Sequence, residues 1–179
     1  MIETERLILR PYTEADRDAF AELNGHPEVG AWLASVLTRE QSVAMMDRIS
    51  GQIAEQGFGF WGAERKADRR LVGMIGLLVM GEGLPAPGGI ELAWRVHPEA
   101  QGTGLATEGA KAARDWAFAN LDIAEVVAIT AESNVRSQAV MTKLGLVRDP
   151  AQDFDHPKLA EDHPLRRHVF FSQKRPSLP

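Results

Sequence analysis

A short glycine-rich turn carries the clearest chemical signal in this chain. It reads Gln101-Gly102-Thr103-Gly104-Leu105-Ala106, and from Gly104 onward the spacing of apolar residues becomes helical. The turn therefore lies directly before a helix, whose first N–H groups are unpaired and whose dipole is positive at that end. Glycine also lets a ligand approach the backbone closely. These residues predict a cradle for a pyrophosphate, although an ordinary strand-to-helix turn would have the same composition.

The stretch before the turn alternates in side-chain type, as a strand does. One face would carry Ile90, Leu92, Trp94 and Val96, and the other Glu91, Ala93 and Arg95. His97-Pro98 ends the strand, because proline has no N–H to donate to a neighbouring strand.

Glu91 stands out in this strand, because the other residues of its stretch are mostly apolar or small. A buried carboxylate is costly unless it has a partner or a function. A peptide α-amine, for example, has a pKa near ~7.7–8, so at neutral pH most of it is ammonium and is not nucleophilic. A carboxylate that binds the ammonium and takes up its proton would solve this. A salt bridge to an arginine would also account for Glu91.

The rest of the chain supplies the elements that must position these residues. Strands are expected at 6–11, 58–65, 71–80, 126–130, 146–148 and 168–173, with a hairpin at 67–70. Helices are expected after Thr13, within 27–37, from Thr38 to Gly57, from Gly104 to about Asn120 with a left-handed cap there, and from Asn134 to Gly145. Residues 149–165 are expected to form a loop. This order predicts an α+β protein, with a mostly antiparallel sheet covered by helices on both faces.

Composition narrows the classes of function. The chain has 179 residues, 44% of them hydrophobic, with a net charge of −5. A nucleic-acid binder would usually carry a basic face, and no apolar run approaches the ~20 residues that span a bilayer. The first residues lack the pattern of a signal peptide, so a cytoplasmic location is expected. The chain has no cysteine, which excludes a cysteine acyl-enzyme and a cysteine zinc site.

The histidines near the C-terminus do not have the spacing of a metal site. His156, His163 and His168 match no standard zinc pattern, so no metal is expected. A loop that lines an acceptor pocket, with His156 or His163 in contact with substrate, explains them better.

The turn and the element order closely resemble the GCN5-related N-acetyltransferase (GNAT) superfamily. The coenzyme-A motif of that family is Q/R-x-x-G-x-G/A, which Gln101, Gly104 and Ala106 match. The resemblance covers nearly the whole chain. It implies that residues 1–179 form a single N-acetyltransferase domain with the GNAT fold and with acetyl-CoA as its co-substrate. A dinucleotide-binding G-x-G-x-x-G would need glycine at Thr107, and no P-loop G-K-[ST] occurs.

The resemblance also implies particular site residues on both sides of the turn. In the family, the strand that holds Trp94, Arg95 and Val96 bulges and separates from its neighbour, and its free backbone groups hold the pantetheine and the thioester. The Trp94 side chain itself is expected to pack in the core. The pyrophosphate would be held by Gln101, Gly102, Thr103, Gly104, Leu105, Ala106 and Thr107.

Asn134 and Ser137 form an N-x-x-S motif that is similar to the RimJ/RimL-like subgroup of ribosomal-protein N-terminal acetyltransferases. The resemblance implies that Asn134 contacts the pantetheine and that Ser137 protonates the departing thiolate, although a helix cap alone explains both residues. Many family members use a tyrosine as this acid. Met141 stands at about that position, and the only tyrosine is Tyr12. The acid is therefore Ser137, a water or no group at all.

The resulting hypothesis is direct transfer from acetyl-CoA to a primary amine in a ternary complex. Glu91 would act as base or ammonium anchor. The amine would belong to a protein N-terminus or to a small molecule, with no nucleic acid or membrane as partner. The alternative is a catalytically degenerate acyl-CoA-binding sensor. A homodimer through the C-terminal strand is compatible with the pattern.

Overall fold

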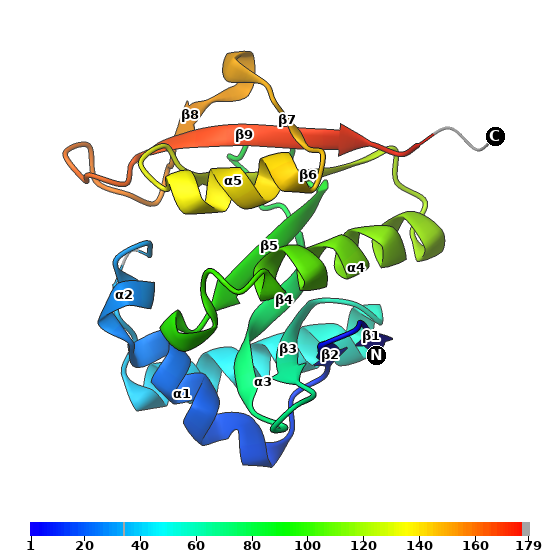
Figure 1. Ribbon diagram of the computed structural model, residues 1–179. Helices are drawn as coiled ribbons and strands as arrows, with labels where there is room; N and C mark the ends of the chain where they lie inside the picture. Colours follow the sequence, from blue (N-terminus) through cyan, green and yellow to red (C-terminus); the bar gives the residue numbers. More distant parts are fainter. Residues whose placement is uncertain (34, 177–179) are drawn as a thin grey trace.

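The computed structural model describes residues 1–33 and 35–176, which build a nine-stranded sheet with helices packed on it (Figure 1). The strands are β1 (Ile2–Glu3), β2 (Leu7–Arg10), β3 (Phe60–Arg65), β4 (Leu71–Val79), β5 (Ile90–Val96), β6 (Glu125–Ala131), β7 (Val147–Arg148), β8 (Phe154–Asp155) and β9 (Arg167–Lys174). Their order in the sheet is β1-β2-β3-β4-β5-β6-β9-β7, and β8 also pairs with β9.

The α-helices are α1 (Arg17–Gly25), α2 (Pro27–Gly30), α3 (Arg39–Gln56), α4 (Leu105–Asn120) and α5 (Val135–Lys143). Three single-turn 3-10 helices, η1 (Glu14–Asp16), η2 (Pro98–Ala100) and η3 (Pro150–Gln152), precede α1, the glycine turn and β8.

The sheet is antiparallel except at one junction, which confirms the expected mostly antiparallel arrangement. β5 and β6 are parallel and pair only at Ile90 with Val126 and at Glu91 with Val127. Beyond Glu91, β5 pairs with β4 alone, so the strands separate as expected. The ladder between β4 and β5 runs from Ile90 to Val96 without a register shift, so the bulge expected in this strand is not seen there.

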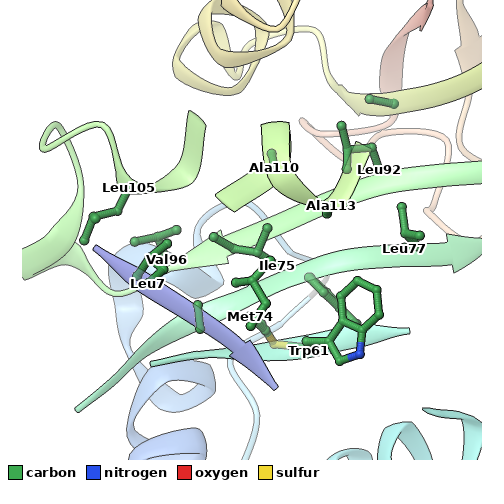
Figure 2. Close-up of a cluster of buried hydrophobic side chains, with 14 of the residues drawn as sticks. Leu7, Trp61, Met74, Ile75, Leu77, Leu92, Val96, Leu105, Ala110 and Ala113 are labelled. Atoms are coloured by element: carbon green, nitrogen blue, oxygen red, sulfur yellow. The ribbon is translucent and has the colours of Figure 1, made fainter. Parts of the chain in front are cut away.

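Helices cover both faces of the sheet, as predicted. Helix α4 packs on the face that carries Leu7, Ile75 and Leu92, and Figure 2 shows its Ala110 and Ala113 directed at these side chains. Gly109 permits this close packing, because a Cβ there would lie 2.6 Å from Ile75 Cδ1. Helices α1 and α3 pack together and against β4 and β3 on the opposite face.

Local signals set most helix boundaries. Thr38 and Gln41 form the expected capping box of α3, and Gly57 ends it at a φ of 77°. Gly145 follows α5 at a φ of 84°. Asn120 does not adopt the expected left-handed conformation, because Leu121 closes α4 in an extended conformation. The stretch 149–165 is not entirely loop, because it contains η3 and β8.

Candidate active site

A cavity of about 930 Å³ lies where β5 and β6 separate, between the glycine turn, α2 and α5. It brings together most of the residues expected from the sequence. Its walls include Glu91, Trp94, Arg95, Val96, Gln101, Gly102, Gly104, Ala106, Thr107, Asn134 and Ser137. Thr103 and Leu105 do not line it.

The glycine turn presents backbone N–H groups to this cavity. Gly102 and Gly104 have φ values of 74° and 86°, a left-handed conformation that glycine adopts without strain. Within the described residues, the N–H groups of 102–107 have no hydrogen-bond partner. The turn therefore ends in unpaired donors at the positive end of the 16-residue helix α4.

The side chains of Thr103 and Leu105 serve the turn itself. The Thr103 hydroxyl donates to the carbonyl oxygen of Ala100 at 2.6 Å, so its proton is already used. Leu105 is buried in the core beneath α4. These two residues can therefore bind an anion only through their backbone N–H groups.

The segment around Thr4 and Arg6 braces the turn, a contact that no local pattern in the sequence predicts. Arg6 Nη1 donates to the carbonyl oxygen of Thr103 at 2.9 Å. The Glu108 carboxylate accepts from Thr4 Oγ1 at 2.6 Å, and from the backbone N and the Nε of Arg6 at 2.7 and 2.6 Å. Burial alone would raise the pKa of Glu108, but these hydrogen bonds outweigh it and lower the pKa.

Gln101 connects three elements around the turn. Its side chain donates to the carbonyl oxygen of Val96 at 3.1 Å, which fixes the turn to the end of β5. Its Oε1 accepts from Arg136 Nη1 at 3.3 Å, which links the turn to α5 across the cavity.

Glu91 lies in the cavity wall on the same face of β5 as Arg95. Among the described residues, no hydrogen bond or ion pair reaches its carboxylate, so the salt bridge considered from the sequence is not found. Burial raises the pKa of Glu91 from 4.5 to about 7, because desolvation disfavours the charged form. Such a carboxyl group can exchange a proton near neutral pH.

Helix α5 closes the cavity on the side of β6. The Asn134 side chain caps it by accepting from the backbone N of Ser137 at 3.2 Å, and both residues face the cavity. Met141 lines the same wall. Tyr12 is not among the residues that line the cavity. Its hydroxyl donates to the carbonyl oxygen of Phe60 at 2.8 Å, and burial raises its pKa.

Comparison with known families identifies this arrangement. A family model described as "Acetyltransferase (GNAT) domain" matches residues 6–147, most of the chain. The chain belongs to the GNAT acetyltransferase family. The glycine turn, the separated strands and α4 all lie within the matched residues.

Individual relatives agree with this family. The acetyltransferase is 25% identical to the uncharacterized N-acetyltransferase YoaA of Bacillus subtilis (strain 168), over 83% of this chain and 84% of that protein. A GNAT-family acetyltransferase from Bacillus anthracis superposes with a TM-score of 0.80 at 20% identity, over 97% and 98% of the two chains. A spermidine N-acetyltransferase from Vibrio cholerae, solved with CoA and spermine, gives 0.74 at 15% identity, over 96% and 97%.

Two cations in the cavity of the acetyltransferase were not assigned a role from the sequence. Arg136 and Lys143 of α5 both line the cavity. They lie seven positions apart in a chain that is acidic overall, and nothing in the overall composition distinguishes them from the other basic residues. Spacing along α5 was the only available signal, since positions 136, 140 and 143 share one face of a helix.

The histidines divide into two groups. His156 and His168 line the cavity, with ring centroids 4.9 Å apart, and burial lowers the pKa of both. His163 does not line it; its Nδ1 accepts from the backbone N of Leu165 at 3.1 Å. In the described part of the chain, no three His, Asp or Glu side chains are grouped so as to hold a metal ion.

Proposed function

We propose that this acetyltransferase transfers an acetyl group from acetyl-CoA directly to a primary amine within a ternary complex. The observation that carries the proposal is that the unpaired N–H groups of the turn and the unpartnered Glu91 carboxylate open into the same cavity. One end of that cavity suits a polyanion, and the other suits an amine that must lose a proton.

The coenzyme end fits a pyrophosphate. The N–H groups of residues 102–107 would bind its oxygens at the N-terminus of α4. Arg136 and Lys143 would add positive charge from α5. Past Glu91, no described strand pairs with the edge of β5 that faces β6, and the Val96 carbonyl oxygen at its end accepts from Gln101. The other backbone groups of this edge can hold the pantetheine and polarise the thioester carbonyl.

Glu91 would supply the base. Acetyl-CoA provides an activated acetyl thioester, and the amine nitrogen forms the new bond to its carbonyl carbon while the carbon–sulfur bond breaks. The proton lost by the amine passes to the Glu91 carboxylate, directly or through a water. With a pKa of about 7, Glu91 is mostly ionised at slightly alkaline pH and can accept that proton.

The thiolate that leaves needs a proton from Ser137 or from water. Ser137 lines the cavity, and its backbone is fixed by Asn134. The N-x-x-S motif of these two residues supports a RimJ/RimL-like acceptor, the α-amine of a protein N-terminus. A small-molecule amine uses the same chemistry, and acceptor specificity depends on the side of the cavity that faces α1 and α3.

Three measurements test this function. Calorimetry with acetyl-CoA is expected to give saturable binding. Release of free thiol in the presence of a panel of amines is expected to exceed hydrolysis without amine, and initial rates at varied concentrations of both substrates should give intersecting lines. Parallel lines would rule out direct transfer. Binding without thiol release for any amine would instead indicate an acyl-CoA-binding module, and no binding would overturn the proposal entirely.

A further inference from the structure

A second, smaller cavity adjoins the active-site cavity on the α3 side. We call it the side pocket; its volume is about 460 Å³. Leu33 and Arg95 line both cavities, so the two meet at these side chains. Its polar lining consists of Arg95, Arg48, Gln41 and Ser35, and the rest is apolar. No residue recorded in its lining is acidic.

Arg95 is a half-buried cation, and no carboxylate pairs with it among the described residues. Its guanidinium donates to the side-chain oxygen of Asn24, which is fully buried in α1. Arg10, another arginine in the same sheet, differs, because Asp16 and Glu64 pair with it at 2.7 and 2.6 Å. Burial lowers the pKa of Arg95 to about 10, so it stays charged at neutral pH at a cost in desolvation.

Arg48 adds a second cation to the side pocket. No ion pair or hydrogen bond of its side chain occurs among the described residues. Its neighbours in sequence and on the same helix are paired: Asp47 with Arg17 at 3.0 Å, and Arg39 with Asp18. The chain has a net charge of −5, but the lining of this pocket carries two arginines and no acidic residue among those described. The side pocket is therefore locally positive.

We infer that the acceptor amine also carries a carboxylate, which the side pocket binds through Arg95 and Arg48. This inference rests on the proposed function, because it assigns the second end of the substrate whose amine reaches Glu91. A guanidinium binds a carboxylate with two parallel hydrogen bonds. Its desolvation costs less free energy than that of an ammonium, because it is more weakly hydrated. A purely cationic acceptor, such as a polyamine, would meet like charge at this point.

Strand geometry limits the size of this acceptor. Glu91 and Arg95 lie on one face of β5 and four residues apart, so their Cα atoms are separated by about 13 Å at the usual rise per residue. Amine and carboxylate of the acceptor are thus several bonds apart, as in an ω-aminocarboxylic acid or a short peptide.

Matched acceptors test the inference. Thiol release is measured with an ω-aminocarboxylic acid and its amide, with a dipeptide and its C-terminal amide, and with spermidine. We expect kcat/KM to be about tenfold or more higher for each acid than for its amide, with spermidine poorest. An aminoalkyl phosphate tests whether the pocket prefers another anion. A higher kcat/KM with the phosphate than with the carboxylic acid would contradict the inference that the pocket binds a carboxylate.

Variants of three arginines locate the effect. Arg48→Gln and Arg95→Gln are expected to raise KM for the acids about tenfold, to leave kcat nearly constant and to reduce the preference for acid over amide. The control is Arg39→Gln, which also removes a positive charge from α3 but at a position outside both cavities. It should change neither KM nor kcat. Arg48 is exposed, so Arg48→Gln should not affect folding. This variant keeps the test valid even if Arg95→Gln destabilises the fold by removing the hydrogen bond to Asn24.

The outcomes separate this inference from the proposed function. Equal kcat/KM for acids and amides, with robust thiol release, would overturn the side-pocket assignment and leave the acetyltransferase chemistry intact. A preference for acids that survives both Arg48→Gln and Arg95→Gln would also overturn it. Failure to bind acetyl-CoA would instead refute the proposed function.

Discussion

The two ends of the active-site cavity are built in different ways. The proposed coenzyme end consists of backbone N–H groups from one continuous turn, residues 102–107, at the start of α4. The proposed acceptor end consists of side chains on one face of β5, mainly Glu91 and Arg95. Arg95 contacts Asn24 of α1 and lines the side pocket together with residues of α3. One end is a property of the local chain, and the other depends on tertiary packing.

This difference predicts that a change at the proposed acceptor end leaves the proposed coenzyme end intact, and the reverse. Replacing side chains at 91, 95 or 48 leaves the turn intact, because no hydrogen bond joins them to it among the described residues. Replacing a glycine of the turn alters the coenzyme end without touching the acceptor face. Each variant below should therefore affect one end and spare the other.

Glu91→Gln should have the largest effect, and only at the acceptor end. The amide cannot take up the proton of the amine, so kcat/KM should fall by about a hundredfold or more, while the Kd of acetyl-CoA stays unchanged. The wild-type rate should rise with pH through about 7, the pKa of Glu91, and this limb should vanish in the variant. An unchanged pH profile would exclude Glu91 as the base.

Gly102→Ala should damage the coenzyme end alone. Gly102 and Gly57 have φ values of 74° and 77°, and an added Cβ would meet no atom within 4 Å at either position. Alanine should therefore cost both about the same strain, on the order of 1 kcal/mol. Only Gly102 lines the cavity, so only Gly102→Ala should raise the Kd of acetyl-CoA, by about tenfold. Equal Kd values for the two variants would contradict the cradle.

Glu91 should also leave a signature in stability. Its folded pKa of about 7 exceeds its ordinary value of 4.5, so the folded state binds the proton more tightly and loses stability as pH rises from 4.5 to 7. Glu91→Gln removes this loss. Its free energy of unfolding should match wild type below pH 4.5 and exceed it by up to about 3 kcal/mol at alkaline pH, as measured by denaturant titration. A constant difference across pH would contradict the raised pKa.

Ser137→Ala should have the smallest effect. A thiol with a pKa near ~8.5 leaves readily, and water in an open cavity can protonate it, so kcat should fall by less than about tenfold. The Asn134 cap uses the backbone N of residue 137, so the thermal midpoint should not change. A hundredfold loss in kcat would instead make Ser137 the general acid.

The sequence predicted features that depend on neighbouring residues. The glycine turn, the Thr38–Gln41 capping box and the Asn134 cap each need only a few consecutive positions, and all three form as expected. The alternation in 90–96 likewise placed Glu91 and Arg95 on one face. These are local geometries that residue type nearly determines.

Features that depend on distant contacts were missed. The two-residue strands β1 and β8 are too short to leave a periodic pattern, and they exist because β2 and β9 pair with them. The side pocket exists because tertiary packing places Arg48 of α3 and Arg95 of β5, 47 positions apart in sequence, in the lining of one cavity. Asn120 favoured a left-handed cap by residue type, but the chain continues extended toward β6 instead.

The brace from the N-terminal segment to the turn has a practical consequence for handling the protein. Thr4 and Arg6 form hydrogen bonds with Glu108, and Arg6 also donates to the carbonyl oxygen of Thr103. A purification tag fused close to Thr4 and Arg6 would add chain next to the contacts that fix the turn. Measurements of coenzyme affinity are therefore best made after such a tag has been removed.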